Sequence, residues 1–197
     1  MQPLQPMTLA GEVVRLEPHA EHHRPALQQA ADDPDLWRYA LRPGFGEHFE
    51  GWWQEQQQGL HAGAAIPWVV ILQSTGQLIG STSFLNISLR DQRLEIGSTW
   101  YQKKYHGTAV NPACKGLLLQ LAFETLGFYR VEFCVDALNH HSRRAVTKLG
   151  ATQEGMLRSH RITQTGRRRD TVLFSLLRSE WPAVQQRLFN RLQLQPI

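Results

Sequence analysis

Hydrophobic and polar residues alternate in several short stretches of the chain, which is the pattern of half-buried β-strands. In the first, Val14 and Leu16 face one way and Arg15 and Glu17 the other, and Pro18 ends the strand. The apolar runs 68–72 and 78–84 then flank the turn-forming residues 74–76. This arrangement predicts a β-hairpin.

A further strand is predicted from Leu94 to Tyr101. Positions 94, 96, 98 and 100 alternate with positions 95, 97, 99 and 101. Glu95 is therefore expected on the face opposite Leu94 and Ile96. Gly97, in mid-strand, predicts a β-bulge.

Helix-forming residues without internal proline predict helices over His19 to Ala31 and Glu47 to Leu60, which we expect to flank a substrate cleft. Asn111 and Pro112 predict the N-cap and first position of another helix, running to Gly127. The remaining predicted elements are a buried strand (131–135), a short helix capped by Asn139 and ending at Gly150, strands 156–162 and 171–177, and a C-terminal helix. This order predicts an α/β fold in which the helix beginning at Asn111 connects two neighbouring parallel strands.

Composition favours an ordinary globular protein. The chain has 197 residues, of which 42% are hydrophobic and 19% charged, so we expect one domain over residues 1–197 with a flexible N-terminus at 1–10. No apolar run approaches the ~20 residues of a membrane span, and the N-terminus does not resemble a secretion signal, which predicts a cytoplasmic protein. Cys114 and Cys134 match neither a disulfide framework nor a metal site.

Basic residues outnumber acidic ones, giving a net charge of +4 and a pI near 9.4. Apart from Arg143-Arg144 and Arg167-Arg168-Arg169 they are scattered, which favours a solvated surface or a phosphorylated small molecule over nucleic acid. No aromatic and basic residues interleave on the predicted strands as in RNA-binding sheets. A basic RNA- or ribosome-associated binding module is therefore the lesser alternative.

The segment from Tyr105 to Asn111 joins a predicted strand to a helix and contains Gly107. Unpaired amides and the helix dipole at such a junction attract phosphate oxygens. Turns of this kind are also common without any ligand, so both interpretations stay open at this point.

The series Asn-x-x-Ser-Arg-Arg-Ala-x-x-Lys-Leu-Gly, from Asn139 to Gly150, is followed by Glu154, Gly155 and Arg158. Together these residues resemble the ribosomal-protein N-terminal acetyltransferase (RimJ/RimL-like) branch of the GCN5-related N-acetyltransferase (GNAT) superfamily. The resemblance extends over nearly the whole chain. It implies an α/β (α+β) GNAT fold, with a mixed, mostly antiparallel sheet of about seven strands that is flanked by helices and splayed between strands 4 and 5.

The resemblance also implies acetyl-coenzyme A (acetyl-CoA) as acetyl donor and an amine, of a protein N-terminus or a small molecule, as acceptor. Relatives usually have a second glycine where this chain has Ala109, and alanine disfavours positive φ, so we expect a looser or shifted phosphate loop. The residues matched to cofactor binding are Trp100, Tyr101, His106, Gly107, Thr108, Ala109, Val110, Asn111, Asn139, Ser142 and Arg143.

Two residues are candidates for the catalytic chemistry. Glu95 matches the central acidic position of relatives and is the candidate base, acting directly or through a water; its alternative role is a solvent-facing strand carboxylate. Ser142 matches the position near the thioester, where a hydroxyl can donate a proton to the departing thiolate; its alternative role is a surface serine. A fold that binds coenzyme A without catalysis stays an alternative.

Three tryptophans, Trp37, Trp52 and Trp53, are the candidates for contact with the acceptor, although tryptophans are more often core residues. No metal is expected, because the adjacent pairs His22-His23 and 140–141 should point in divergent directions and lack a suitably spaced acidic partner. A homodimer through the last strands or the C-terminal helix is a further expectation.

Overall fold

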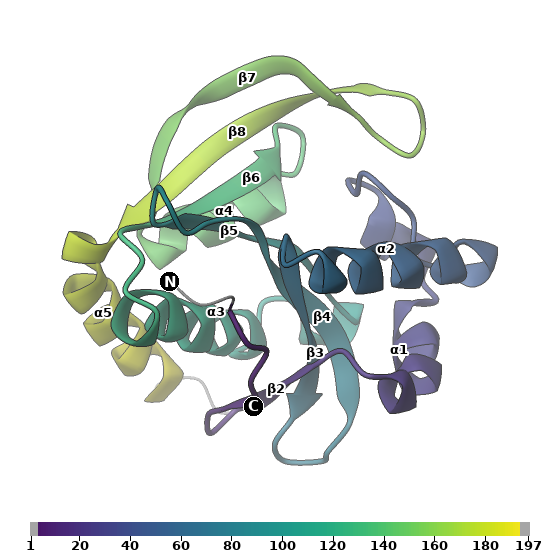
Figure 1. Ribbon diagram of the computed structural model, residues 1–197, viewed down its shortest axis with the longest axis horizontal. Helices are drawn as coiled ribbons and strands as arrows, with labels where there is room; N and C mark the ends of the chain where they lie inside the picture. Colours follow the sequence, from purple (N-terminus) through teal and green to yellow (C-terminus); the bar gives the residue numbers. More distant parts are fainter. Residues whose placement is uncertain (1–3, 194–197) are drawn as a thin grey trace.

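A single eight-stranded sheet, in the order β1-β2-β3-β4-β5-β6-β8-β7, organises the computed structural model, which describes residues 4–193 (Figure 1). All neighbouring strands are antiparallel except β5 and β6. The expected mixed, mostly antiparallel sheet is confirmed, and so is the parallel pair. The strands are β1 (Leu9–Ala10), β2 (Val14–Pro18), β3 (Ala65–Leu72), β4 (Leu78–Ser88), β5 (Arg93–Tyr101), β6 (Arg130–Asp136), β7 (Thr152–Ile162) and β8 (Arg168–Leu177).

Helices cover both faces of this sheet. In Figure 1, α1 and α2 lie together on one side of the central strands, and α3 and α5 lie together on the other. The expected helix over 19–31 is divided into a 3-10 turn, Glu21–His23, and α1, and a π-helical segment, Leu121–Thr125, continues α3. The helices are α1 (Arg24–Ala31), α2 (Phe49–His61), α3 (Val110–Gln120), α4 (His140–Leu149) and α5 (Trp181–Gln193).

Two hydrophobic cores lie on opposite faces of the sheet, because side chains alternate along a strand. From β3, Trp68 and Val70 enter the larger core with the residues of α3, whereas Val69 and Ile71 enter a smaller core with α1 and α2. The smaller core is rich in tryptophan and contains Trp37, Trp52, Trp53 and Trp100.

The bulge in β5 changes which residues share a face. The β4–β5 register shifts between Ser81 and Ser83, and Ser98 has a φ of 46°, so the bulge lies just after the expected position, Gly97. Before the bulge, Leu94 and Ile96 face the larger core. After it, Tyr101 enters the larger core and Trp100 the smaller one, so the simple alternation predicted from the sequence was wrong at this end of the strand. Glu95 and Trp100 consequently point to the same side of the sheet.

The start of α3 also differs from the expectation. The helix begins at Val110 with Ala109 as its N-cap, so Asn111 is inside the first turn and does not cap it. Ala109 has φ −65° and is buried, so alanine imposes no backbone strain at this position; a looser or shifted phosphate loop stays a prediction. Gly107 is the residue in this loop with positive φ, at 80°.

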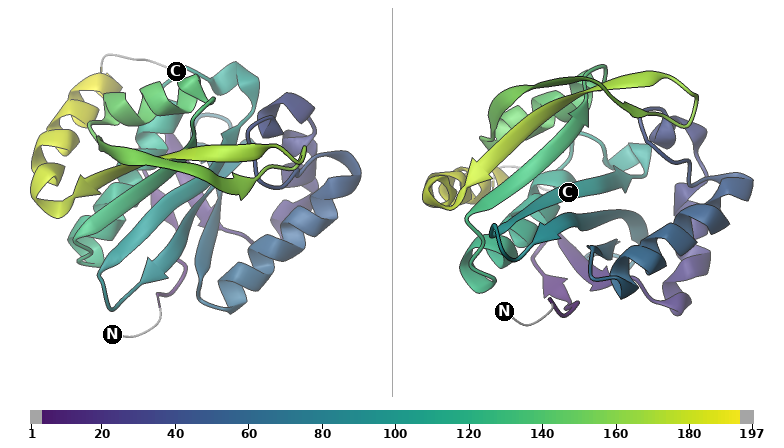
Figure 2. Two further views of the ribbon diagram at one scale, coloured as in Figure 1. Left: turned by 90° about the horizontal axis from the view of Figure 1, so that it is seen from above. Right: turned by 45° about the horizontal axis from the view of Figure 1, so that its top comes forward.

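The hairpin of β7 and β8 reaches from the side of α5 across the molecule towards α1 and α2 (Figure 2). Near its tip, Gln164 donates a hydrogen bond from Nε2 to the carbonyl oxygen of Trp37 at 2.6 Å. This contact links the end of the hairpin to the segment between α1 and α2.

The N-terminal segment expected to be flexible includes β1, whose Leu9 and Ala10 pair with β2. The Trp68 indole also donates to the carbonyl oxygen of Met7 at 2.8 Å. Among the described residues, no helix has the length and apolar character needed to span a membrane.

Candidate active site

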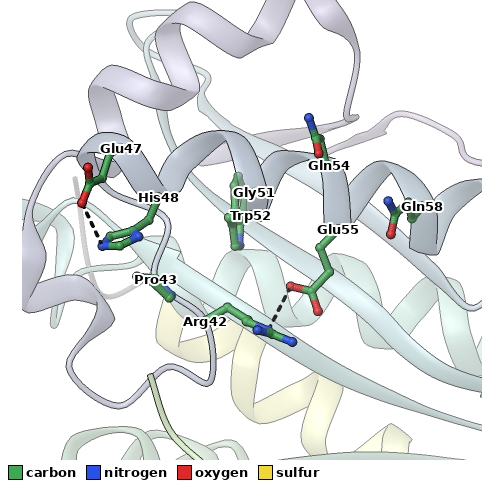
Figure 3. A pocket seen from close by; sticks show the side chains of 9 residues that line it. All are labelled: Arg42, Pro43, Glu47, His48, Gly51, Trp52, Gln54, Glu55 and Gln58. Carbon is green, nitrogen blue, oxygen red and sulfur yellow. Dashed lines mark ion pairs between the residues drawn. The ribbon is translucent and has the colours of Figure 1, made fainter. Parts of the chain in front are cut away.

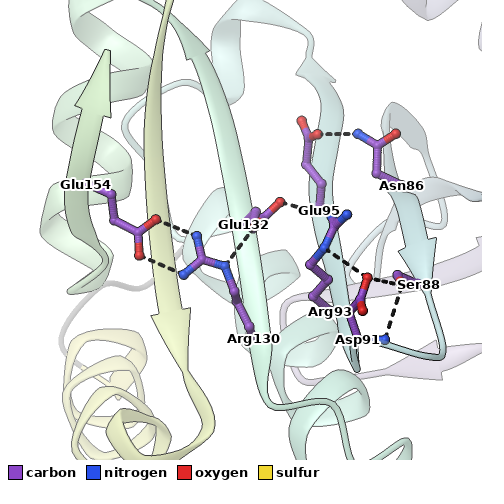
Figure 4. Close-up of polar contacts among 8 residues, drawn as sticks. All are labelled: Asn86, Ser88, Asp91, Arg93, Glu95, Arg130, Glu132 and Glu154. Atoms are coloured by element: carbon purple, nitrogen blue, oxygen red, sulfur yellow. Dashed lines mark hydrogen bonds and ion pairs between the residues drawn. The ribbon is translucent and has the colours of Figure 1, made fainter. Parts of the chain in front are cut away.

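The pairing between β5 and β6 is confined to the beginning of both strands. It extends from Arg93 opposite Arg130 to Glu95 opposite Glu132, and no further pairs follow although β5 continues to Tyr101. In the paired segment, charged side chains lie on one face of the sheet (Figure 4). There Arg93 and Arg130 both form ion pairs with Glu132. The sheet is therefore splayed between β5 and β6. These are the fourth and fifth strands predicted from the sequence, because β1 was not predicted, so the splay lies where it was expected.

The loop that leads from β5 into α3 presents unpaired backbone amides. The amides of Gly107, Ala109 and Asn111 have no hydrogen-bond partner within the described residues, whereas the Val110 amide donates to Thr108 Oγ1 at 3.3 Å. His106 Nε2 lies 2.9 Å from the carbonyl oxygen of Tyr101 and so fixes the loop against the end of β5. Free amides at the N-terminus of a helix form an anion-binding site.

The same loop lies against the start of α4. The rings of His106 and His141 stack with centroids 5.7 Å apart and an interplanar angle of 24°. The pKa of His141 is lowered, first by burial and then by the nearby His106, Arg144 and Lys148. The two segments singled out in the sequence therefore meet at one place, and basic side chains surround it.

The first turn of α4 is organised by Asn139. Its side-chain oxygen accepts a hydrogen bond from the Ser142 amide at 3.0 Å, so the predicted N-cap role is confirmed. Arg143 donates from Nη1 to the carbonyl oxygen of Ala137 at 3.1 Å, which holds the preceding loop. Whether Asn139, Ser142 and Arg143 contact a cofactor stays a prediction.

Glu95 is buried on the side of the sheet that carries the tryptophan core, with 6% of its surface exposed, so it is not a solvent-facing strand residue. Its Oε2 accepts a hydrogen bond from Asn86 Nδ2 at 2.8 Å (Figure 4). A Cβ at Gly97 would lie 2.8 Å from a Leu85 methyl carbon and 3.0 Å from Glu95 Oε1, so this glycine leaves room for the carboxylate. On β6, burial and the Glu95 carboxylate raise the pKa of the Cys134 thiol to about 12, which keeps the thiol protonated.

The three tryptophans expected near the acceptor form a cluster with Trp100. The Trp37 ring lies 5.3 Å from the Trp100 ring and 5.5 Å from the Trp52 ring, and Trp52 lies 6.0 Å from Trp100. Trp37, Trp52 and Trp53 are between 2% and 4% exposed, so they are core residues, and their contact with the acceptor stays a prediction. The indole nitrogen of Trp100 is buried without a hydrogen-bond partner among the described residues.

A groove of about 500 Å³ lies along α2, and Trp52 forms part of its lining (Figure 3). Arg42 and Glu55 point towards each other across it, with 3.8 Å between guanidinium and carboxylate, and both are exposed. Trp52 thus belongs both to the groove and to the cluster around Trp100. A ligand in the groove would be separated from Trp100, at the end of β5, by the Trp52 ring.

The histidine pair at 22–23 does not behave as the sequence suggested. The two rings lie 3.9 Å apart between centroids, and Glu17 provides a nearby carboxylate 3.0 Å from His23 Nε2. The expectation of divergent rings without an acidic partner was wrong here, because the 3-10 turn folds the pair back onto the end of β2.

Sequence reasoning missed Asn86, Cys134 and Lys115. Asn86 and Cys134 are brought to Glu95 by strand pairing across β4, β5 and β6, which no local pattern reports. Lys115 lies one turn beyond Asn111 in α3 and donates from Nζ to Thr99 Oγ1 at 2.7 Å, directly at the β5 bulge. The sequence did carry one signal for Lys115. It lies three and four residues before Leu118 and Leu119, and this helical spacing places all three side chains on one buried face of α3.

Comparison with known proteins agrees with this architecture. Residues 14–152 match the model of an acetyltransferase (GNAT) domain. The N-acetyltransferase p20 of Bacillus licheniformis, itself uncharacterised, is 29% identical over 119 residues, which are 60% of this chain and 66% of that protein. The chain thus spans just under two thirds of the length of the curated relatives it matches.

Solved structures are similar over most of their length. A GCN5-related N-acetyltransferase from Brucella melitensis superposes with a TM-score of 0.89 at 28% identity, covering 97% of this chain and 87% of the other. RimJ of Mycobacterium smegmatis, solved in complex with CoA-disulfide, has a TM-score of 0.79 at 21% identity, covering 96% and 95%, and so shares the fold. With the family model matching more than half of the sequence, the chain belongs to the GNAT acetyltransferase family.

Proposed function

We propose that the protein transfers the acetyl group of acetyl-CoA to a primary amine, of a protein N-terminus or a small molecule, by direct attack in a ternary complex. The observation that carries this proposal is the meeting of the unpaired amides at Gly107, Ala109 and Asn111 with the start of α4. These amides fit the diphosphate of the cofactor, since three free N–H groups and basic neighbours suit anionic oxygens. The thioester of the bound cofactor would supply an activated acetyl group.

Glu95 is proposed as the base that takes a proton from the acceptor, directly or through a water. Asn86 holds Oε2 of the carboxylate through its amide, and the Cys134 thiol is a second hydrogen-bonding neighbour of the same carboxylate. Gly97 keeps the space beside Oε1 free of a side chain. The amine nitrogen would thus lose its proton on the side of the sheet where Trp100 and the α2 groove lie.

Ser142 is proposed to provide the proton that the coenzyme sulfur gains as the carbon–sulfur bond breaks and the carbon–nitrogen bond forms. The capped first turn of α4 fixes the Ser142 backbone through Asn139. A backbone amide near Trp100, displaced from regular pairing by the bulge, is proposed to bind the carbonyl oxygen as negative charge develops on it.

Turnover of a panel of amines, including N-terminal peptides, tests this proposal through the release of free coenzyme A thiol. Glu95→Gln is expected to lower kcat by roughly 10²- to 10⁴-fold with little change in acetyl-CoA affinity. Glu132→Gln is the matched control, because Glu132 is the register partner of Glu95 but is bound by Arg130 at 2.7 Å. Ser142→Ala is expected to lower kcat while cofactor binding persists.

Two results would contradict parts of the proposal separately. Failure of acetyl-CoA to bind at millimolar concentration in a thermal-shift measurement would reject the cofactor site. Binding without turnover on any amine would instead favour a coenzyme A-binding protein that is not catalytic, and unchanged turnover in both Glu95→Gln and Ser142→Ala would refute the assigned roles.

A further inference from the structure

Glu17, His22 and His23 form a cluster of potential metal ligands that has no part in the proposed acetyl transfer. Each offers one ligand atom, and these atoms lie within 4.8 Å of one another. Glu17 is at the end of β2, and the two histidines belong to the 3-10 turn that precedes α1. Among the described residues, no other group of three such side chains meets this distance.

Arg15 orients the carboxylate of Glu17 by binding the oxygen that does not face His23. Arg15 donates from Nε to Glu17 Oε1 at 2.5 Å, which leaves Oε2 directed at His23 Nε2, 3.0 Å away. A spacing of about 3 to 3.5 Å between ligand atoms is what a tetrahedral ion with ~2.1 Å bonds requires. In the structure these two atoms share a hydrogen bond, so a metal ion would replace the proton between them, and the ligand atom of the exposed His22 lies within 4.8 Å of both.

We infer that Glu17, His22 and His23 bind a divalent transition-metal ion of the zinc class, with water completing the coordination. Two imidazoles and one carboxylate favour zinc, cobalt, nickel or copper over calcium or magnesium, which prefer oxygen ligands alone. The proposal replaces the sequence-based expectation of no metal and is independent of the proposed acetyl transfer.

The ion would join the end of β2 to the start of α1. Leu27, Ala30 and Ala31 of α1 pack in the same core as Trp37 and Trp100. In the next layer, the ring of His19 stacks on Trp53 with centroids 5.2 Å apart. The metal site would therefore fix the position of α1, which packs against the tryptophan cluster. This is a structural role that requires no contact with the reacting groups.

Zinc titration of the full-length, tag-free, chelator-treated protein tests this inference by isothermal calorimetry. We expect saturation at one Zn²⁺ per chain, a rise in melting temperature with zinc, and a visible absorption band when Co²⁺ replaces it. His22→Ala should weaken zinc binding more than about tenfold, and since His22 is exposed, the variant should fold normally. Glu17→Gln should weaken binding in the same direction.

His140→Ala is the matched control, because His140 is also exposed and also the first of two adjacent histidines. It is expected to bind zinc as the parent protein does. The inference would be overturned if no saturable binding occurred up to about 100 μM Zn²⁺, or if His22→Ala and His140→Ala reduced binding equally, since the second result indicates nonspecific surface histidines.

Discussion

Replacement of Lys115 by methionine is expected to stabilise the protein at neutral pH. Lys115 lies in α3 with 7% of its surface exposed, and among the described residues its ammonium donates only to the hydroxyls of Thr99, at 2.7 Å, and Thr82, at 3.5 Å. No carboxylate neutralises the ammonium, so burial lowers its pKa from 10.5 to about 8. Methionine has a similar length and carries no charge to bury.

The expected gain follows from this pKa difference. At ~1.4 kcal/mol per pKa unit, burying the charged lysine costs about 3 kcal/mol. The lost hydrogen bonds to the two threonines offset roughly 1 to 2 kcal/mol of this, because a donor that is charged makes stronger bonds. Thr99 keeps its contacts with Thr82 and Gly97, so Lys115→Met should raise the free energy of unfolding by about 1 to 2 kcal/mol at neutral pH.

The pH dependence distinguishes this explanation from better packing. Below pH about 8, Lys115 is charged in both the folded and unfolded states and the cost is complete. From there towards pH 10.5 the unfolded chain still binds a proton that the folded chain has lost, so the wild-type protein gains stability relative to the variant. The advantage of Lys115→Met should therefore disappear across this range.

Urea unfolding of both proteins between pH about 7 and 10 measures the effect as a difference. The difference matters because burial raises the pKa of Cys114 and of Cys134 to about 12, and both thiols destabilise each protein as the pH rises above 9. These contributions cancel between wild type and variant. A variant less stable than wild type at neutral pH, or an advantage independent of pH, would refute the reasoning.

Three further substitutions address the loop, the base and the hairpin. Gly107→Ala forces a side chain into a backbone with φ 80°, so it should cost roughly 1 to 2 kcal/mol and weaken acetyl-CoA binding in calorimetry; unchanged affinity would mean that the loop does not hold the cofactor. Gly97→Ala should crowd Glu95 and lower kcat without altering cofactor affinity, which steady-state kinetics and calorimetry separate; equal losses in both would indicate a general distortion of the sheet. Gln164→Ala removes the bond to Trp37 and should raise the acceptor KM several-fold at constant kcat; an unaffected KM would show that the hairpin tip does not border the acceptor.

Local sequence patterns predicted the elements that depend on neighbours along the chain. The hairpin of β3 and β4 follows from two apolar runs around a turn, and Asn139 caps α4 because its side chain reaches the Ser142 amide three residues later. The parallel neighbours β5 and β6 follow from the helix between them.

Features set by contacts between distant segments were not predictable in this way. The bulge after Gly97 moves Trp100 to the other face, and only pairing with β4 determines where that shift occurs. The spacing of Lys115 from residues 118 and 119 indicates a buried helix face, but burial of a lysine there depends on its contact with Thr99 in a distant strand. The convergence of His22 with Glu17 depends on a 3-10 turn, for which the sequence carries no distinct signal.

The three residue pairs between β5 and β6 make the sheet mechanically uneven. Strands β1 to β5 form one leaf and β6 to β8 the other, and between the leaves the ladder ends at Glu95 and Glu132. A fluctuation that parts the leaves meets less resistance at this seam than between any antiparallel neighbours with long ladders. Any molecule that touches both leaves would therefore stiffen the whole protein, and amide hydrogen exchange in the second half of β5 is the place where that stiffening should be largest.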